Sequence, residues 1–394
     1  MNMKKIFSLS LLFVALLSSI PSDACTSAIF TGKCTPDGRP LLWKHRDTGE
    51  LNNRIEFFPA GNGAVYSFLG LVNSPVQGGE VWTGTNEVGF SIMNTASYNL
   101  QEEKAKIEDQ EGVVMYKALG SCRTLADFEK LLDKMKKPLG VEANFGVIDA
   151  EGGAAYYEVN NTRWTKVDVN DPKIAPEGFL VYTNHSYTGR KDEGMGYVRY
   201  NTANEITHRA WIRGEDFTPQ WIFNNLSRSY YNSLLGIDLN KNPELAPDGW
   251  FVDQDFIPRR STSASIVVKG VKKGENPELT VMWTILGYPP CGIAVPLFVA
   301  MGADQPEYML KGSGKGNNCK MCDEVLARRA KIFTLGRGNG KNYFNVGKAQ
   351  EYINSFAAQE DQTFQSTEVL MEKMYKKGAF NQEGLKDIYR LIHP

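Results

Sequence analysis

The sequence is short of histidine, of net charge and of long apolar runs, and each shortage argues against a class of function. Four histidines among 394 residues limit the scope for a cysteine–histidine catalytic pair. A formal net charge of −1 provides no electrostatic attraction to nucleic acid or to an anionic membrane surface. Beyond the first 24 residues, no apolar run is long enough to span a bilayer. We therefore expect neither a nucleic-acid partner nor an integral membrane segment in the rest of the chain.

Metal and cofactor motifs are also scarce. Cys319 and Cys322 have the spacing of a metal or redox motif, but no second convincing ligand pair accompanies them. A local disulfide or a small loop clamp is the preferred interpretation of this pair. Setting Cys25 aside leaves an odd number of cysteines, so at least one should be free; they are Cys34, Cys122, Cys291, Cys319 and Cys322. We expect no metal and no cofactor.

What is present is the composition of a globular domain, with 42% apolar and 11% aromatic residues. The pattern predicts strands first, then helices, further strands and terminal helices. This order suits an α+β fold of two antiparallel sheets with helices packed outside. We expect one domain, residues 25–394, with a C-terminal helical extension. The main expected strands are residues 25–30, 41–43, 90–94, 145–149, 154–159, 178–182, 261–269 and 279–286; the main expected helices are 112–119, 125–136, 201–212, 219–231, 349–357 and 367–393.

The N-terminus has the layout of a secretory signal peptide. Two lysines precede an apolar run over residues 6–20, and the small residues Ser22 and Ala24 follow it. The predicted cleavage lies between Ala24 and Cys25, which makes residues 1–24 the signal peptide. The compact, lysine-rich leader is of bacterial type, so we expect a periplasmic or secreted protein.

Cleavage at this position would give Cys25 both a thiol and a free α-amine. An α-amine has a reference pKa near 8, so much of it can act as a base close to neutral pH. The thiol is already a strong nucleophile once it ionises. Cys25 could therefore supply nucleophile and base without a histidine. Two other interpretations stay open: half of a disulfide, common in exported proteins, or the attachment point of a lipid anchor.

A charged sequence follows the second predicted strand, at Lys44, His45, Arg46 and Asp47. A hairpin would return it to the neighbourhood of Cys25. Asp47 could then orient an α-amine, while Lys44 or Arg46 stabilises a developing anion. The alternative is a solvated charged turn.

Further candidate residues stand at the ends of later strands. Asn94 and Asn184 each follow an apolar strand, and an asparagine amide can donate to an oxyanion. Each can equally be a turn or cap residue. Arg260, beside Arg259, is either a surface charge or an active-site cation. His185, next to Asn184, leaves a papain-like cysteine–histidine pair as an alternative interpretation.

The order of these features resembles that of the N-terminal-nucleophile cysteine hydrolases. The resemblance is to the choloylglycine hydrolase and penicillin V acylase group and to the acyl-coenzyme A:6-aminopenicillanate acyltransferase-like group. It covers roughly residues 25–286, and the features that carry it are Cys25-Thr26, a turn at Gly38, residues 44–47, Asn94, the hairpin 145–159 and Thr183-Asn184-His185.

The resemblance implies an αββα four-layer sandwich and hydrolysis of a non-peptide amide bond. By position, Cys25 is similar to the nucleophile and Asp47 to the carboxylate that holds its α-amine. Asn94 and Asn184 are similar to the paired asparagines of the oxyanion or amine site. The implied downstream arginine is Arg260. Two departures are Lys44, where bile-salt hydrolases carry arginine, and His45, where asparagine is usual.

Together these observations predict an exported amide hydrolase that cleaves a small N-acyl amide through a thioester at Cys25. Acyl transfer to an amine is the alternative on the same fold. A lipid-anchored binding protein, with Cys25 acylated, is the alternative of another class. The substrate and the oligomeric state stay open.

Overall fold

The computed structural model describes residues 24–76, 78–101, 108–253, 255–337 and 341–394. The predicted signal peptide, residues 1–24, lies outside this part of the chain except for Ala24. Within the described residues, no helix is long and apolar enough to cross a membrane.

A seven-stranded antiparallel sheet is built from strands that follow one another in sequence, with two helices inserted after the fourth strand. Its hairpins follow local turn signals: between β5 and β6 the chain turns at Gly89, which has a φ of 78° that favours glycine. In sheet order its strands are β3 (Asn53–Phe58), β4 (Phe68–Asn73), β5 (Thr83–Asn86), β6 (Ser91–Ala96), β7 (Ala143–Ile148), β8 (Ala154–Val159) and β9 (Trp164–Asp168).

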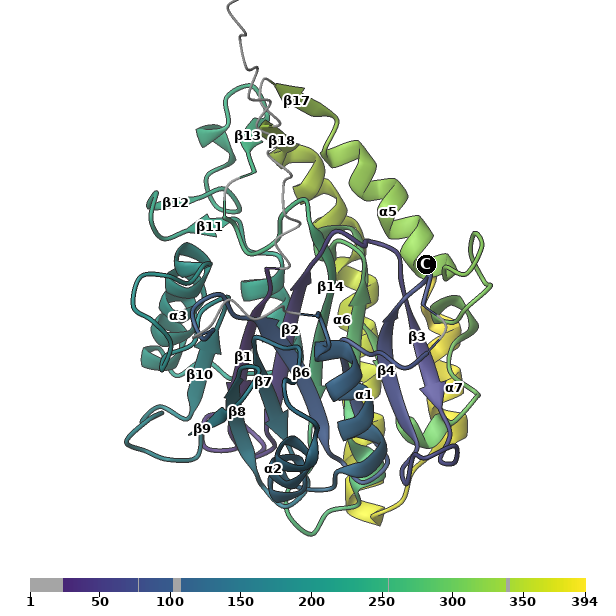
Figure 1. Cartoon of the computed structure of the whole chain (residues 1–394). Coiled ribbons are helices and arrows are strands. Elements are labelled where there is room, and N and C mark those ends of the chain that lie inside the picture. Colours follow the sequence, from purple (N-terminus) through teal and green to yellow (C-terminus); the bar gives the residue numbers. More distant parts are fainter. Residues whose placement is uncertain (1–23, 77, 102–107, 254, 338–340) are drawn as a thin grey trace, which may run out of the picture.

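A six-stranded antiparallel sheet joins strands from distant parts of the sequence. Strand β2 lies between the N-terminal strand β1 and the much later β14, and it is antiparallel to both (Figure 1). In sheet order its strands are β10 (Phe179–Tyr182), β1 (Thr26–Phe30), β2 (Leu41–Asp47), β14 (Thr262–Lys269), β15 (Val281–Leu286) and β16 (Val295–Leu297).

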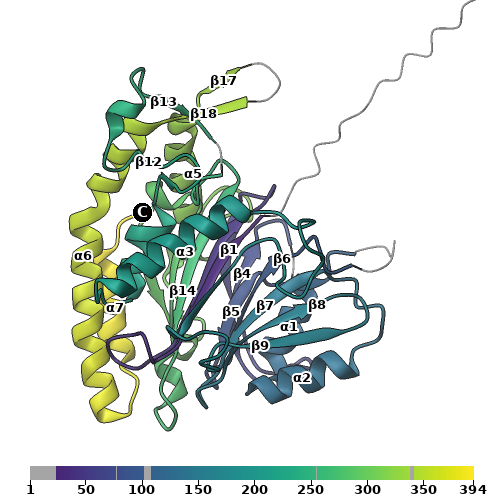
Figure 2. The same ribbon diagram turned by 90° about the vertical axis from the view of Figure 1, so that its left-hand side faces the viewer.

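The two sheets pack face to face, with β2 against β6 and β7, and helices cover both outer faces (Figure 2). On the seven-stranded sheet these are α1 (Glu111–Ser121) and α2 (Leu125–Lys134). On the other side are α3 (Tyr197–Ile212), α4 (Pro219–Ile222), α5 (Lys320–Ile332), α6 (Val346–Lys377) and α7 (Gln382–Leu391). The expected α+β fold, with its αββα sandwich, is confirmed.

Two small sheets lie beside the sandwich. One pairs β11 (Tyr231–Asn232) with β12 (Ile237–Asp238), and the other joins β13 (Trp250–Val252), β18 (Lys341–Asn345) and β17 (Leu335–Arg337) at one end of the molecule (Figure 1).

Three local expectations were wrong in instructive ways. The helix expected at residues 219–231 is α4 followed by a π-helical turn, Phe223–Ser227. The two expected C-terminal helices are divided elsewhere: α6 runs unbroken to Lys377, since no glycine or proline lies between Lys348 and Lys377, and ends at Gly378 with a φ of 64°. The disulfide considered for Cys319 and Cys322 is not formed. Both are free thiols, and Cys319 Sγ caps α5 by accepting from the Cys322 N–H.

A buried ion pair fixes α6 to the six-stranded sheet. Glu360 accepts two hydrogen bonds from Arg228, at 2.6 and 2.7 Å, and one from the backbone N–H of Ala294. The Arg228 guanidinium also donates to the carbonyls of Pro289 and Gly292. Both side chains of the pair are at most 6% exposed, so neither charge would find water if the other were removed.

We expect Glu360→Ala to lower the free energy of unfolding by about 3–5 kcal/mol, because it leaves Arg228 charged and buried. Urea denaturation measures this change. Glu372→Ala, on an exposed position of α6, is the control and should change stability little. Equal effects from the two substitutions would contradict a stabilising role for the ion pair.

Candidate functional site

The charged end of β2 is buried, so the alternative interpretation of this segment as a solvated turn is wrong. All seven residues of this strand are buried, including Lys44, His45, Arg46 and Asp47. Side chains alternate between the faces of a strand, so Lys44 and Arg46 share one face. Both reach the seven-stranded sheet: Lys44 contacts Asn94 of β6, and Arg46 donates to Asn53 and Asn73.

Four of the predicted site residues line one pocket of about 610 Å³. Cys25 precedes β1, Lys44 and Asp47 lie on β2, and Asn94 comes from β6. The hairpin register places Thr26 opposite His45, which brings the start of β1 beside the end of β2. The pocket therefore lies at the same end of both sheets.

Asp47 is held by two donors from the segment that leads into β14. Its Oδ1 accepts from the Thr262 hydroxyl at 2.6 Å, and its Oδ2 accepts from Arg259 Nε at 2.9 Å. Arg259 also donates to the carbonyl of Ala24 at 3.1 Å. Burial acts to lower the pKa of Arg259, but the carboxylates of Asp47, Asp255 and Asp253 together outweigh it and the pKa is raised. One guanidinium thus joins Asp47 to the residue before Cys25.

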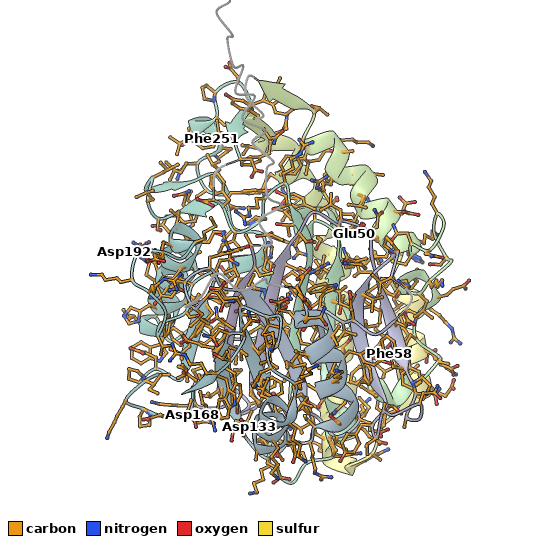
Figure 3. The ribbon with its side chains drawn as sticks, viewed as in Figure 1. Glu50, Phe58, Asp133, Asp168, Asp192 and Phe251 are labelled. Carbon is orange, nitrogen blue, oxygen red and sulfur yellow. The ribbon has the colours of Figure 1, made fainter. Side chains whose placement is uncertain are left out.

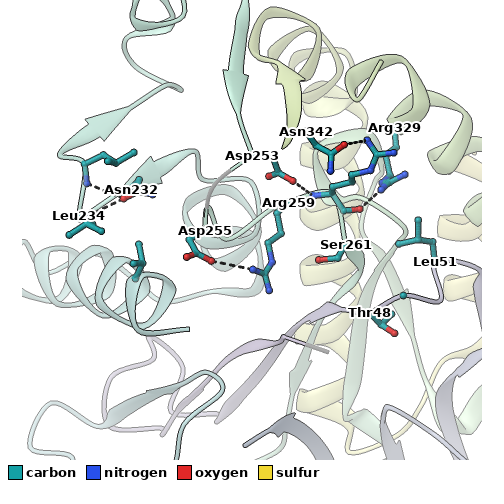
Figure 4. A pocket seen from close by; sticks show the side chains of 14 residues that line it. Thr48, Leu51, Asn232, Leu234, Asp253, Asp255, Arg259, Ser261, Arg329 and Asn342 are labelled. Atoms are coloured by element: carbon teal, nitrogen blue, oxygen red, sulfur yellow. Dashed lines mark hydrogen bonds and ion pairs between the residues drawn. The ribbon is translucent and has the colours of Figure 1, made fainter. Parts of the chain in front are cut away.

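Arg260 is not brought into this group. It is exposed, its backbone N–H donates to Asp253, and its guanidinium donates to Asn342. It lines a second pocket of about 880 Å³, together with Arg259 and Arg329 (Figure 4). The two pockets meet at Thr48 and Gly49, which line both. Arg259 is therefore the better placed of the two neighbouring arginines.

Arg199, on α3, was missed by the sequence analysis. Its guanidinium donates to the Cys25 carbonyl and the Thr26 hydroxyl, each at 2.8 Å, and to Asn184 Oδ1 at 2.7 Å. Burial, followed by repulsion from Arg259, lowers its pKa to about 10. No motif marks this arginine in the sequence, because its partners are as much as 174 residues away.

The two asparagines are oriented by these cations. Lys44 Nζ donates to Asn94 Oδ1 at 2.6 Å and to the Trp82 carbonyl at 2.5 Å. An ammonium has no acceptor, so the Asn94 oxygen must face Lys44 and its amide nitrogen must point elsewhere. Arg199 fixes Asn184 in the same way, and the Asn184 amide donates to the Ala96 carbonyl at 2.9 Å. Asn184 supports the site but is not among the residues that line the pocket with Cys25.

The histidines do not complete a cysteine–histidine pair in the described pocket. No histidine is among its lining residues. His185 stacks on Tyr197, with ring centroids 4.5 Å apart, and its Nδ1 lies 3.2 Å from the Thr183 hydroxyl. His45 is fully buried, and its Nε2 lies 3.2 Å from the Thr262 hydroxyl. In the described parts of the chain, no group of three or more His, Cys, Asp or Glu residues is arranged to hold a metal ion.

No family model matches the chain, and no curated protein matches it. Among solved structures, the chain is similar to an N-acylethanolamine-hydrolyzing acid amidase ortholog from Caenorhabditis elegans (TM-score 0.40, 15% identity, 62% of this chain and 92% of that one). It is also similar to a mutant of the conjugated bile acid hydrolase from Clostridium perfringens (TM-score 0.37, 13% identity, 66% and 89%). A third is penicillin V acylase from Agrobacterium tumefaciens (TM-score 0.32, 12% identity, 69% and 86%).

The last two of these proteins bear names from the group that the sequence resembles. The likeness concerns the arrangement of sheets and helices.

The five other cysteines do not line the pocket that contains Cys25. Burial raises the pKa of each thiol: to about 12 for Cys34 and Cys122, to about 11 for Cys322, and also upward for Cys291 and Cys319. Few of these thiols are ionised near neutral pH, and the thiolate is the reactive form.

We expect iodoacetamide at about pH 7.5 to alkylate Cys25 first in a chain that begins at this residue. Peptide mass spectrometry over a time course identifies the modified thiol. The urea-denatured protein, in which all six cysteines should react, is the control for labelling efficiency. Faster modification of Cys122 or Cys291 would show that Cys25 is not the accessible reactive thiol.

His45 should make the protein sensitive to acid. Burial, with repulsion from Arg199 and Arg259, lowers its pKa from 6.5 to about 4, although Asp47 opposes the change. The unfolded chain therefore takes up a proton near pH 6.5, whereas the folded chain does so only near pH 4. The stabilisation is complete above the higher pH and is lost as the pH falls toward the lower one.

We expect wild-type protein to lose up to about 3 kcal/mol more stability than His45→Gln over this interval. Urea denaturation at a series of pH values measures the difference. The exposed His208 offers a matched control, since His208→Gln should follow the wild-type curve. Identical slopes for wild type and His45→Gln would exclude His45 as the source.

Proposed function

We propose that this chain is an exported amide hydrolase whose nucleophile is the thiol of Cys25, exposed by removal of residues 1–24. The observation that carries the proposal is the shared pocket of Cys25, Lys44, Asp47 and Asn94. Attack on an amide carbonyl requires a nucleophile, a group that orients its base, and a donor to the oxyanion. The pocket offers a thiol, a buried carboxylate and an oriented amide for these roles.

The base in this proposal is the α-amine of Cys25. The Ala24 N–H donates to the Asp47 carbonyl at 3.2 Å, and the Ala24 carbonyl accepts from Arg259. Once the bond between Ala24 and Cys25 is cut, the new amine lies beside Asp47 and Arg259. Arg199 remains on the Cys25 carbonyl. Two guanidinium groups near an amine favour its neutral, basic form, and the Asp47 carboxylate supports the ammonium that forms when the amine takes up a proton.

The reaction then needs no further base. The α-amine takes the thiol proton as Cys25 Sγ forms a bond to the acyl carbon, and the Asn94 amide nitrogen donates to the developing oxyanion. The amine half of the substrate leaves with the proton, and a thioester remains on Cys25. Water, deprotonated by the same α-amine, attacks the thioester, the bond between the acyl carbon and Cys25 Sγ breaks, and the α-ammonium returns the proton to the sulfur as the acid is released.

The burial of Cys25 also argues for this role over a lipid anchor. Cys25 is 5% exposed and lines the pocket between the sheets. A lipid on its thiol would have to fill that pocket, whereas an anchor must extend into a membrane.

We expect activity on a panel of N-acyl amino acids, bile-salt conjugates and penicillin V to require a chain that begins at Cys25. Retaining Ala24 should abolish turnover, because the base is then an amide. Cys25→Ser should retain little activity, since a hydroxyl is harder to deprotonate. Asp47→Asn and Asn94→Ala should each lower kcat by about a hundredfold, or about 3 kcal/mol.

Two matched variants serve as controls for these measurements. Cys34→Ser removes a thiol outside the pocket and should keep full activity. Arg260→Met should keep most activity, whereas Arg259→Met, one residue earlier, should lose it. Turnover by a chain with a blocked N-terminus, or an acyl adduct on another cysteine, would refute the proposal.

A further inference from the structure

The pocket that contains Cys25 is lined by an excess of acidic side chains. Five lining residues carry carboxyl groups and two carry cationic groups; the acids are Asp47, Glu50, Asp109, Glu111 and Glu142, and the cations are Lys44 and Arg46. Asp47 forms an ion pair with Arg259. Among the described residues, no ion pair includes Asp109, Glu111 or Glu142. The proposed hydrolysis uses none of these three acids.

Glu111 is the most constrained of these acids. It is the first residue of α1 and is only 4% exposed. Its Oε1 accepts from the Glu142 backbone N–H at 3.2 Å, whereas its buried Oε2 has no hydrogen-bond partner among the described residues. A buried polar atom left without a partner costs about 1–3 kcal/mol.

A second carboxylate, that of Asp109, lies close enough to repel the Glu111 carboxylate and to share a proton with it. Burial and the neighbouring Asp109 together raise the pKa of Glu111 to about 8. Asp109 itself is exposed, so the buried Glu111 has a neighbouring carboxylate that reaches solvent. Glu142 lies alongside and accepts from the backbone N–H groups of Leu100 and Gln101. Adjacent carboxylates repel one another unless a proton or a cation lies between them.

The loop after β2 adds a further acid to this pocket. Figure 3 labels Glu50 between Phe251, near one end of the molecule, and Asp133 and Asp168, near the other. Glu50 Oε1 accepts from the backbone and side-chain nitrogens of Asn52. The loop thus places the Glu50 carboxylate in the pocket of Cys25. Thr48 and Gly49, which precede Glu50, also line the second pocket, which contains Arg259, Arg260 and Arg329.

We propose that this pocket binds a positively charged group of the amide substrate, a primary ammonium or a guanidinium, between Glu111 and Asp109. An ammonium has three donors, and each can be shared with a carboxylate oxygen. The bound cation supplies the partner that Glu111 Oε2 lacks and removes the repulsion between the two acids. The assignment of the cation to a substrate rests on the proposed hydrolase function.

Matched amide substrates test the proposal in the chain that begins at Cys25. The pairs are ω-aminohexanoyl against hexanoyl anilide, with the charge on the acyl side, and N-hexanoyl agmatine against N-hexanoyl pentylamine, with the charge on the amine side. In at least one pair the cationic member should have a kcat/KM higher by about tenfold or more. Glu111→Gln should abolish this preference and spare the neutral member.

One further variant controls for the loss of a charge, and another replaces Glu111→Gln if that protein does not fold. Glu383→Gln removes the same charge from an exposed site on α7 and should keep the preference. Asp109→Asn, at an exposed position, replaces Glu111→Gln if that variant does not fold. Equal losses on cationic and neutral substrates would show that the two acids merely share a proton, and no preference in either pair would overturn the proposal.

A change of pH offers a readout that a structural role would not affect. Binding a cation ionises Glu111, so the cationic preference should rise between about pH 7 and about pH 9. Groups that act on both members of a pair, the thiol and α-amine of Cys25 among them, cancel in the ratio of the two kcat/KM values. The other charged groups around this acid are Glu80, beside Asp109, and those that line the pocket: Lys44, Arg46, Asp47, Glu50, Asp109 and Glu142. The rise should disappear in Glu111→Gln.

A binding assay separates this proposal from the hydrolase. Hexylammonium should protect Cys25 from iodoacetamide better than hexanol does, and Glu111→Gln should remove the difference. Protection without turnover of any amide would leave the cation site standing and refute the hydrolase. Turnover without selective protection and without a cationic preference would leave the hydrolase standing and refute the cation site.

Discussion

The antiparallel pairing of β2 with both β1 and β14 is the constraint on which the site depends. This ladder places Thr26 opposite His45 and Thr262 opposite Asp47. A shift by one residue would turn every side chain of β2 to the other face of the sheet. Lys44 would then leave Asn94, and Asp47 would leave Arg259. Three segments that are distant in sequence thus meet because one central strand fixes their register.

Burying so many charges at the end of a central strand is costly unless each finds partners. Lys44, Arg199 and Arg259 all have acceptors within hydrogen-bond distance, and these acceptors belong to both sheets and to the segment around Cys25. The cations therefore connect the two sheets through hydrogen bonds. They orient the two asparagines and the backbone on both sides of the Ala24–Cys25 bond, so stability and the geometry of the site depend on the same contacts.

Charge is also divided between two adjoining pockets. Carboxyl groups outnumber cationic groups beside Cys25, and beyond Thr48 and Gly49 three arginines outnumber two aspartates. The ion pair between Asp47 and Arg259 joins the two regions. The near-zero net charge of the whole chain conceals this separation, because composition averages over surfaces that a ligand meets one at a time.

The sequence alone was sufficient for the local features: the main strands, the α+β class, and the return of the charged end of β2 to the neighbourhood of Cys25, whereas the grouping of Asn94 with them came from the resemblance. These depend on periodicity and on residues at strand ends. Tertiary structure decided between Arg259 and Arg260, because neighbouring side chains diverge and the register is irregular between Thr262 and Ala264. It also brought in Arg199 from α3 and left Glu111 buried beside Asp109. Such contacts depend on how sheets and helices pack, and no short stretch of sequence contains that information.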